Sequence, residues 1–320
     1  MPGKSPALKL IGPFFASLCV LSSLTLGAAP AAAGAACPAG TLGPERTLAL
    51  GTKGGFAIGL KTYPQTLDLA DHEVVLTFDD GPSPKTTPLV LNALAKQCVH
   101  ATFFLIGRNA AAHPALVRRE VADGETLGNH TFSHPARTLR LMSEKAAEAD
   151  IEKGFAADEK AAYGGKTLAE NPASEIRFFR FPGFADTPSL DAWLKAKNIG
   201  IFGADLWASD WRSMTPDEEL KLVLERLEKE RRGILLLHDT HRSTALMLPK
   251  LLVELKKRGF HIVRLVPDDG APPKFRDAPK GWRSETEAIL AKVLAHRQSA
   301  KFEKRNGTTV KRPQQPAAHS

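Results

Sequence analysis

The chain has 320 residues, 43% of them hydrophobic, and a formal net charge of +8. This length allows one or two domains, and the hydrophobic content is ordinary for a globular protein that buries a sizeable core. No internal repeat is evident, and the basic residues are not interleaved with aromatic ones. A repeat architecture and nucleic-acid binding therefore have little support.

The start of the chain, residues 1–36, has the pattern of an export signal. Lys4 and Lys9 precede an apolar stretch, Leu10–Leu26, and an Ala-rich segment with small residues suited to cleavage follows. The alternative is an uncleaved membrane anchor, but the apolar stretch is near the lower length limit for spanning and contains glycine, proline and serine. We therefore expect an exported protein, periplasmic or extracellular, with no stable membrane span after signal removal.

Cysteine usage fits an oxidising compartment. Cys19 would leave with the signal, so the mature chain keeps Cys37 and Cys98, an even number that permits one disulfide. The bridge would tie an N-terminal extension, residues 37–71, to the helix that ends near Cys98. The alternative is two unrelated buried thiols.

The next part of the chain, residues 72–266, alternates strand-like and helix-like segments. Apolar runs predict the strands Glu73–Phe78, Ala101–Ile106, Ile176–Phe181, Ile199–Leu206, Gly233–Leu237 and Phe260–Leu265. Helical spacing and start signals predict the helices Thr86–Gln97, Pro114–Ala122, Ser143–Tyr163, Pro216–Glu230 and Leu246–Arg258. This alternation predicts an α/β fold in which helices surround a parallel sheet, either open or closed into a barrel.

The last segment, residues 267–320, is basic and Pro-rich, with eleven Lys and Arg against six Asp and Glu. A short helix is expected at Ser284–Arg297, within a tail that is otherwise expected to be flexible. A basic tail can hold a protein near an anionic surface polymer by long-range attraction. A merely soluble disordered end is an equally good interpretation.

Two motifs carry most of the chemical information. Asp79 and Asp80 end the first predicted strand, and His130 and His134 follow further along the chain. One Asp and two His leave a divalent metal with an open coordination position, as catalytic zinc sites do, and the spare carboxylate can then act as a general base. Each fragment also has a plain explanation, since Asp-Asp-Gly-Pro is turn sequence and the histidines could share a solvated helix face.

Other polar residues occupy similar places in the predicted sheet. Those at or just past the C-terminal ends of predicted strands are Asp79, Asp80, Arg180, Asp205 and His238. In parallel barrels and open sheets alike, active sites form at this edge. We therefore expect these residues to converge on one rim.

Together the motifs resemble the polysaccharide deacetylase family, the NodB-homology domain of carbohydrate esterase family four. The motifs that carry this resemblance are, in order, Thr77–Pro82, His130–His134, Arg180–Gly183, Asp210–Trp211 and Leu235–Asp239. The resemblance covers residues 72–265 and implies an irregular (β/α) barrel. It also implies a hydrolase that removes the N-acetyl group of sugars in a polysaccharide or oligosaccharide, with peptidoglycan, chitin-like oligomers and other surface glycans all open.

The resemblance further implies roles for single residues. One divalent metal, most simply zinc, with cobalt or nickel as alternatives, would be held by Asp80, His130 and His134. The residues implied in catalysis are Asp79 as base, Arg180 as its partner, His238 as acid and Asp210 as a support of that acid. The residues implied in substrate binding are Gly183, through its backbone N–H, and Trp211.

Two positions depart from the family pattern. Trp207 stands where the fourth motif commonly begins with an acidic residue, so either Asp205 or Asp210 would support His238. Gly183 stands where an aromatic residue often follows the proline, which removes part of a substrate-facing wall that Phe184 could replace.

Two other classes of function remain open. The chain could be a noncatalytic carbohydrate-binding relic of the fold, which the presence of every expected ligand, base and acid disfavours. It could also be a metal amidohydrolase for small nonsugar amides, against which Trp207 and Trp211 argue mildly as candidates for stacking on a sugar.

Overall fold

The computed structural model describes residues 3, 37–43, 45–135, 138–164 and 176–292. The predicted signal peptide lies, apart from Gly3, outside these residues. Within the described parts of the chain, no helix is long and apolar enough to cross a membrane.

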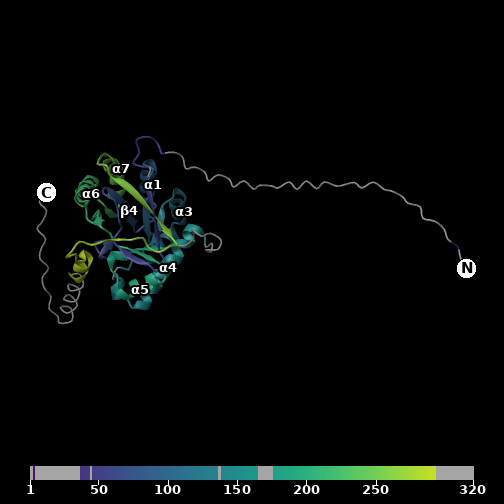
Figure 1. The fold of residues 1–320 in the computed structure, drawn as a ribbon. Coiled ribbons are helices and arrows are strands. Elements are labelled where there is room, and N and C mark those ends of the chain that lie inside the picture. The colour runs from purple at the N-terminus through teal and green to yellow at the C-terminus, as the bar shows by residue number, and fades with distance from the viewer. Residues whose placement is uncertain (1–2, 4–36, 44, 136–137, 165–175, 293–320) are drawn as a thin grey trace. The chain divides into compact units, whose positions relative to one another are not determined.

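A ten-stranded parallel sheet built around β4 (Glu73–Asp79) forms an irregular barrel (Figure 1). β4 pairs along one edge with β5 (Thr102–Leu105) and along the other with β10 (Gly233–His238). The strands that follow β5 across the sheet are β6 (Thr126–Asn129), β7 (Phe178–Phe179), β8 (Gly200–Phe202) and β2 (Phe56–Ile58). The remaining strands are β9 (Leu206–Trp207) beside β10, β11 (His261–Asp268) beside the start of β4, and β1 (Arg46–Gly51) beside β11.

Within the described residues, the helices α1 to α7 lie around this sheet, as Figure 1 shows for the larger ones. They are α1 (Thr87–Lys96), α2 (Gly107–Ala112), α3 (Pro114–Asp123), α4 (Glu144–Tyr163), α5 (Pro188–Ala196), α6 (Pro216–Glu230) and α7 (Arg242–Lys257). The predicted start of α4 is confirmed, because the Ser143 side chain accepts a hydrogen bond from the backbone N–H of Ala146. Thr215 begins α6 in the same way and forms a capping box with Glu218.

Alternation along β4 sorts its side chains between two cores. Leu76 and Phe78 pack outward against the helices, whereas Val75 packs inside the barrel with the rings of Phe104 and Phe202. Because successive strand residues face opposite sides, Thr77 and Asp79 also point into the barrel. The interior of the barrel is therefore apolar at one end and carries polar side chains where β4 ends.

Asp205 follows β8 and hydrogen-bonds to β10, a strand that is not paired with β8. This region between β8 and β10 is here called the seam of the barrel. The backbone N–H of Asp205 donates to the carbonyl of Ile234 (2.9 Å), and its carboxylate accepts from the N–H of Ile234 (2.8 Å). The same carboxylate accepts from the N–H of Leu60 and the hydroxyl of Thr66, at 2.8 and 2.7 Å. Thr66 belongs to β3 (Gln65–Thr66), which pairs with β12 (Arg276–Asp277), so one side chain joins three parts of the chain.

The predicted elements are present, with some different bounds. The strand predicted at Ile176–Phe181 narrows to β7, and the one predicted at Ile199–Leu206 divides into β8 and β9 at the Asp205 seam. The helix predicted from Leu246 begins at Arg242, because its first turn is already packed, with Thr244 and Ala245 buried. Sequence analysis did not predict β1, β2, β3, β6, β12, α2 and α5.

Part of the predicted tail contacts the barrel. The indole N–H of Trp282 donates to the carbonyl of Leu60 (2.6 Å), and the N–H of Thr286 donates to the carbonyl of Lys61 (3.0 Å). Residues 285–292 are helical, within the range in which a short helix is expected. Residues 293–320, which hold many of the tail's basic side chains, lie outside the described residues.

The two cysteines of the predicted disulfide lie side by side. Cys37 and Cys98 are both free thiols in the structure. A hydrogen bond with the Cys98 side chain raises the pKa of the Cys37 thiol, and partial desolvation acts in the same direction. The disulfide stays a prediction, now between side chains in contact.

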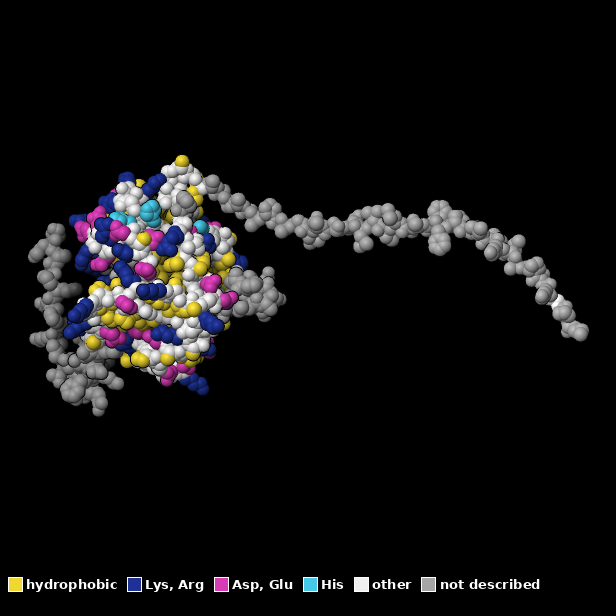
Figure 2. Space-filling view, in the orientation of Figure 1, with side chains coloured by type: hydrophobic (Ala, Val, Ile, Leu, Met, Phe, Trp, Pro, Cys, Tyr) yellow, Lys and Arg dark blue, Asp and Glu magenta, His cyan; other side chains and the backbone are white. Residues whose placement is uncertain are grey.

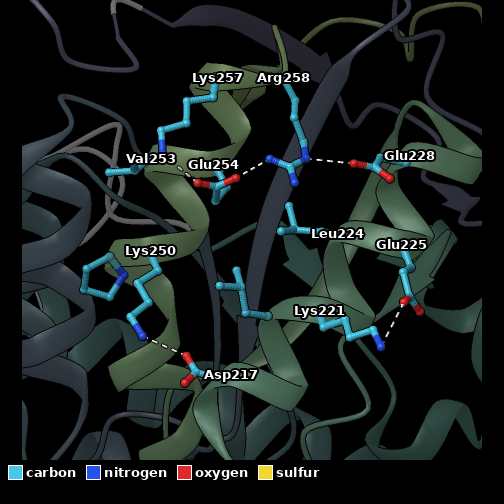
Figure 3. A pocket seen from close by; sticks show the side chains of 12 residues that line it. Asp217, Lys221, Leu224, Glu225, Glu228, Lys250, Val253, Glu254, Lys257 and Arg258 are labelled. Atoms are coloured by element: carbon cyan, nitrogen blue, oxygen red, sulfur yellow. Dashed lines mark hydrogen bonds and ion pairs between the residues drawn. The ribbon is translucent and has the colours of Figure 1, made fainter.

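Surface charges are mixed in sign. On the face shown in Figure 2, basic and acidic side chains alternate, with hydrophobic side chains between them. A cavity of about 620 Å³ between α6 and α7 is similarly lined by ion pairs, such as Lys250–Asp217 and Arg258–Glu228, both at 2.7 Å (Figure 3). None of its lining residues belongs to the motifs, so the charged groove is separate from their chemistry.

We expect Asp205→Ala to lower the free energy of unfolding by about 2–5 kcal/mol, because three donors lose their acceptor in a buried seam. Denaturant unfolding monitored by circular dichroism measures this change. Asp217→Ala is the matched control: its carboxylate is exposed and pairs at the surface, so stability should change little. Equal stability of the two variants would show that the seam does not depend on Asp205.

Candidate active site

The three predicted metal ligands come together at the C-terminal edge of the sheet. The Nε2 atoms of His130 and His134 lie 3.6 and 3.4 Å from Oδ1 of Asp80. This oxygen is buried and has no hydrogen-bond partner among the described residues. A buried oxygen without a partner, facing two imidazole nitrogens, fits a divalent cation better than it fits an empty polar cluster.

Local backbone structure sets the positions of these ligands. Asp80 has a left-handed φ of 75°, which Asp tolerates better than most residues, and its carbonyl accepts from the side-chain amide of Asn109 (2.8 Å). The N–H of His134 donates to the hydroxyl of Thr131 (3.0 Å). The two histidines lie in the loop after β6 and not on a helix, so the solvated-helix explanation of their spacing is wrong.

His130 is fixed in one tautomer. Its Nδ1 donates to the backbone carbonyl of Arg180 (2.7 Å), which leaves Nε2 as the lone-pair donor toward Asp80. Burial lowers the pKa of His130 to about 4, although Asp79 opposes the shift. The imidazole is therefore neutral near pH 7, as a metal ligand must be.

Asp79 is held by a completely buried arginine. The Arg180 guanidinium donates from Nη1 to Oδ1 of Asp79 (2.7 Å) and to the hydroxyl of Thr77 (2.8 Å). Its Nη2 donates to the carbonyl of Gly203 (2.8 Å), and its plane lies over the ring of Phe104, 4.2 Å from the centroid. These contacts leave Oδ2 of Asp79 facing the metal ligands, 3.8 Å from Nε2 of His130.

His238 pairs with Asp210 on the other side of the site. Its Nδ1 lies 2.8 Å from Oδ1 of Asp210, and the other carboxylate oxygen accepts from the N–H of His238 (2.7 Å) and the hydroxyl of Thr244 (2.9 Å). Burial lowers the pKa of His238, but the hydrogen bond and charge of Asp210 outweigh it and raise the pKa to about 9. From the sequence, either Asp205 or Asp210 could support His238. In the structure Asp210 contacts His238, whereas Asp205 hydrogen-bonds to Ile234 at the seam.

An aromatic row leads away from His238. The ring of Trp211 lies 6.0 Å from that of His238, Trp207 lies 5.8 Å from Trp211, and Phe184 stacks on Trp207 at 6.2 Å between centroids. Trp207, at the position that departs from the family pattern, thereby joins the row. Phe184 supplies an aromatic ring next to Gly183, where the motif lacks one.

One cavity of about 410 Å³ contains the predicted site. Its lining residues are Asp79, Asp80, His130, His134, Phe181, Gly183, Phe184, Trp207, Trp211, Leu236, His238, His241, Thr286, Ile289 and Leu290. Arg180 and Asp210 lie behind this lining and act on it through Asp79 and His238. The volume is within the usual range of small-molecule sites, about 300–1,000 Å³.

Sequence analysis missed several lining residues. His241 lies 5.4 Å from His238 between ring centroids, and its place just after the last motif is a signal that could have found it. Thr286, Ile289 and Leu290 had no signal, because they follow the range of the family resemblance.

Comparisons with known proteins identify the family of this chain. The profile of the polysaccharide deacetylase family matches residues 67–189. A chitooligosaccharide deacetylase of Sinorhizobium fredii is 34% identical over 224 residues, which are 66% of this chain and 97% of that protein. The peptidoglycan-N-acetylglucosamine deacetylase PgdA of Listeria monocytogenes is 30% identical over 60% of this chain, and the match spans only 38% of its own length.

The fold has solved counterparts. A peptidoglycan deacetylase of Bdellovibrio bacteriovorus superposes with a TM-score of 0.60 at 30% identity, over 71% of this chain and 60% of that one. The chain belongs to the polysaccharide deacetylase family.

Metal binding should distinguish the adjacent aspartates. Asp80→Ala should lose the metal, because it removes one of three ligands, whereas Asp79→Asn should retain it, because Asp79 faces the site without being one of those ligands. Metal content after dialysis, measured by inductively coupled plasma mass spectrometry, tests both variants. An empty site in Asp79→Asn would show that the two carboxylates share the metal.

Proposed function

We propose that the protein is a metal-dependent deacetylase that hydrolyses the N-acetyl group of N-acetylated sugars in a polysaccharide or oligosaccharide. The observation that carries the proposal is one cavity that holds a three-ligand metal site, a carboxylate fixed by a buried arginine, and a histidine whose pKa is raised. Aromatic rings line the same cavity.

Two residues on opposite sides of the cavity, Asp79 and His238, carry out the proton transfers. Asp79, oriented by Arg180, takes a proton from the attacking water as a general base. His238, held protonated by Asp210, gives a proton to the departing amine. The backbone N–H of Gly183 is the candidate donor to the oxygen of the acetamide.

Asp80, His130 and His134 would hold the metal, and zinc is the simplest choice for one carboxylate and two neutral imidazoles. A divalent cation there supplies Lewis-acid polarisation of the amide and lowers the pKa of water. The unpartnered Oδ1 of Asp80 and the free Nε2 of His130 are the structural support for this assignment.

The substrate class rests on the relatives and on the aromatic row. Relatives of this chain are named for chitooligosaccharide and for peptidoglycan N-acetylglucosamine, so an N-acetylglucosamine-containing glycan is the first candidate. Trp207 and Trp211 offer flat apolar surfaces to the faces of sugar rings. The row therefore favours a sugar substrate mildly over the small nonsugar amide of a metal amidohydrolase.

A cell-wall or other surface glycan would place the protein outside the cytoplasm, periplasmic or extracellular, in keeping with the predicted signal peptide. Attraction of the basic tail to an anionic polymer remains a prediction, because many of the residues concerned lie beyond the described part of the chain.

Acetate release across a panel of glycans tests the function. We expect release from N-acetylglucosamine oligomers or peptidoglycan, loss of activity after chelation, and recovery with zinc or cobalt. Asp79→Asn should lower turnover by roughly a hundred- to ten-thousandfold, the usual span for a general base. Full activity of a verified metal-free preparation would refute the metal assignment, and no release from any glycan would refute the function.

The pH profile tests the role of His238. Its raised pKa means that the protonated acid predominates at neutral pH and is lost as pH rises toward about 9, or somewhat lower beside a bound cation. The kcat/KM of the metal-loaded enzyme should therefore fall on the alkaline side. His238→Ala should keep its metal, lose most turnover and flatten this limb, while Asp210→Asn should move the limb to lower pH. An unchanged limb in His238→Ala would assign the acid to another group.

A further inference from the structure

Residues 282–290, here called the C-terminal wall, are anchored beside the active-site cavity. Besides the bonds of Trp282 and Thr286 to the backbone of residues 60–61, the hydroxyl of Thr286 donates to that of Thr62 (3.3 Å). Glu285 pairs with Lys61, whose ammonium lies 5.1 Å from the centroid of the Trp207 ring. The wall is thus joined to the loop that lies against the aromatic row.

A second anchor ties the wall to the motif loops. Arg140, which follows the metal-binding loop, donates from Nη2 to Asp186 (2.8 Å) and from Nη1 to Glu287 (3.1 Å). Asp186 follows Phe184 closely in the chain. One guanidinium therefore joins the loop after His134, the loop after Gly183 and the C-terminal wall.

These anchors place apolar side chains of the wall in the cavity. Leu290 is 7% exposed, whereas Ile289 is 44% exposed although it lines the same cavity as His134 and His238. Trp211, also in this lining, is 50% exposed. Large apolar side chains that remain exposed together at the mouth of a site are typical of surfaces that bind a ligand.

We propose that the C-terminal wall completes the glycan-binding cleft and that Ile289 is a specificity-determining residue, contacting the sugars that flank the one being deacetylated. This inference rests on the proposed function. It goes beyond the family resemblance, because the wall follows residues 72–265, the range of that resemblance. The preferred substrate is then an oligosaccharide or glycan chain rather than a single sugar.

The test is a series of N-acetylglucosamine oligomers, from the monomer to the tetramer, with full-length, metal-loaded protein. Ile289→Ser should raise KM for the tetramer roughly three- to tenfold, as expected for losing part of the apolar side chain that a flanking sugar would cover, with little change in kcat. The effect should shrink as the oligomer shortens. Metal content and melting temperature should stay unchanged, because Ile289 is not a metal ligand and is 44% exposed.

Val253→Ser is the matched control. Val253 is a β-branched side chain, 41% exposed, that lines the α6–α7 groove and not the active-site cavity (Figure 3). It should leave KM for every oligomer unchanged. If Ile289→Ser behaves like Val253→Ser while the wild type deacetylates the tetramer, the wall has no role in specificity. If the wild type deacetylates no glycan, the proposed function fails first. The wall is then judged by the Kd of the tetramer, measured by calorimetry, which Ile289→Ser must weaken.

Discussion

The active site depends on one buried ion pair. Arg180 is completely buried, and its guanidinium reaches Asp79 and Thr77 on β4 and the carbonyls of residues 202 and 203 at the end of β8. A buried charge is tolerated only when it is paired and its donors are satisfied, and these contacts meet both conditions. The backbone carbonyl of the same residue accepts from His130. Arg180 therefore orients both the candidate base, Asp79, and the candidate metal ligand His130, so these two side chains are coupled.

The surroundings of His130 and His238, on opposite sides of the cavity, give the two imidazoles different protonation states. Burial keeps His130 neutral, with a pKa of about 4, whereas Asp210 keeps His238 protonated, with a pKa of about 9. These imidazoles line one cavity, and the protonation state of each ring suits the role proposed for it. A neutral ring can bind a cation, and a protonated ring can give up a proton. The partner of each Nδ1 atom, the Arg180 carbonyl for His130 and the Asp210 carboxylate for His238, thus suits the two histidines to different proposed roles.

The sequence predicts the main elements of the fold well, because β4, β5, β10 and most helices have clear periodicity and start signals. Short strands escape prediction, since two or three residues, as in β2 and β3, have no period to detect. Their positions are set by pairing with distant strands.

The site is predictable to a similar degree. The candidate metal ligands, Asp79 and His238 were identifiable from their residue types and spacing together with the family motifs that contain them. Asp205 and Asp210 could not be told apart from sequence, because both are acidic residues near one strand end and only the hydrogen bonds distinguish them. Ile289 was not identifiable at all, since an isoleucine in a charged tail has no pattern of its own.

The anchoring of the C-terminal wall on residues 60–62 limits how far the chain can be shortened for expression without loss of structure. These residues, like β1 and β2, precede the sequence motifs, and the C-terminal wall follows the motifs. Segments from before and after the motifs therefore meet beside the candidate active site. The candidate catalytic residues all lie within residues 72–266, whereas the folded domain also includes β1, β2 and the C-terminal wall. An expression fragment trimmed to residues 72–266 would keep every catalytic group and lose two strands of the sheet, together with both halves of this contact.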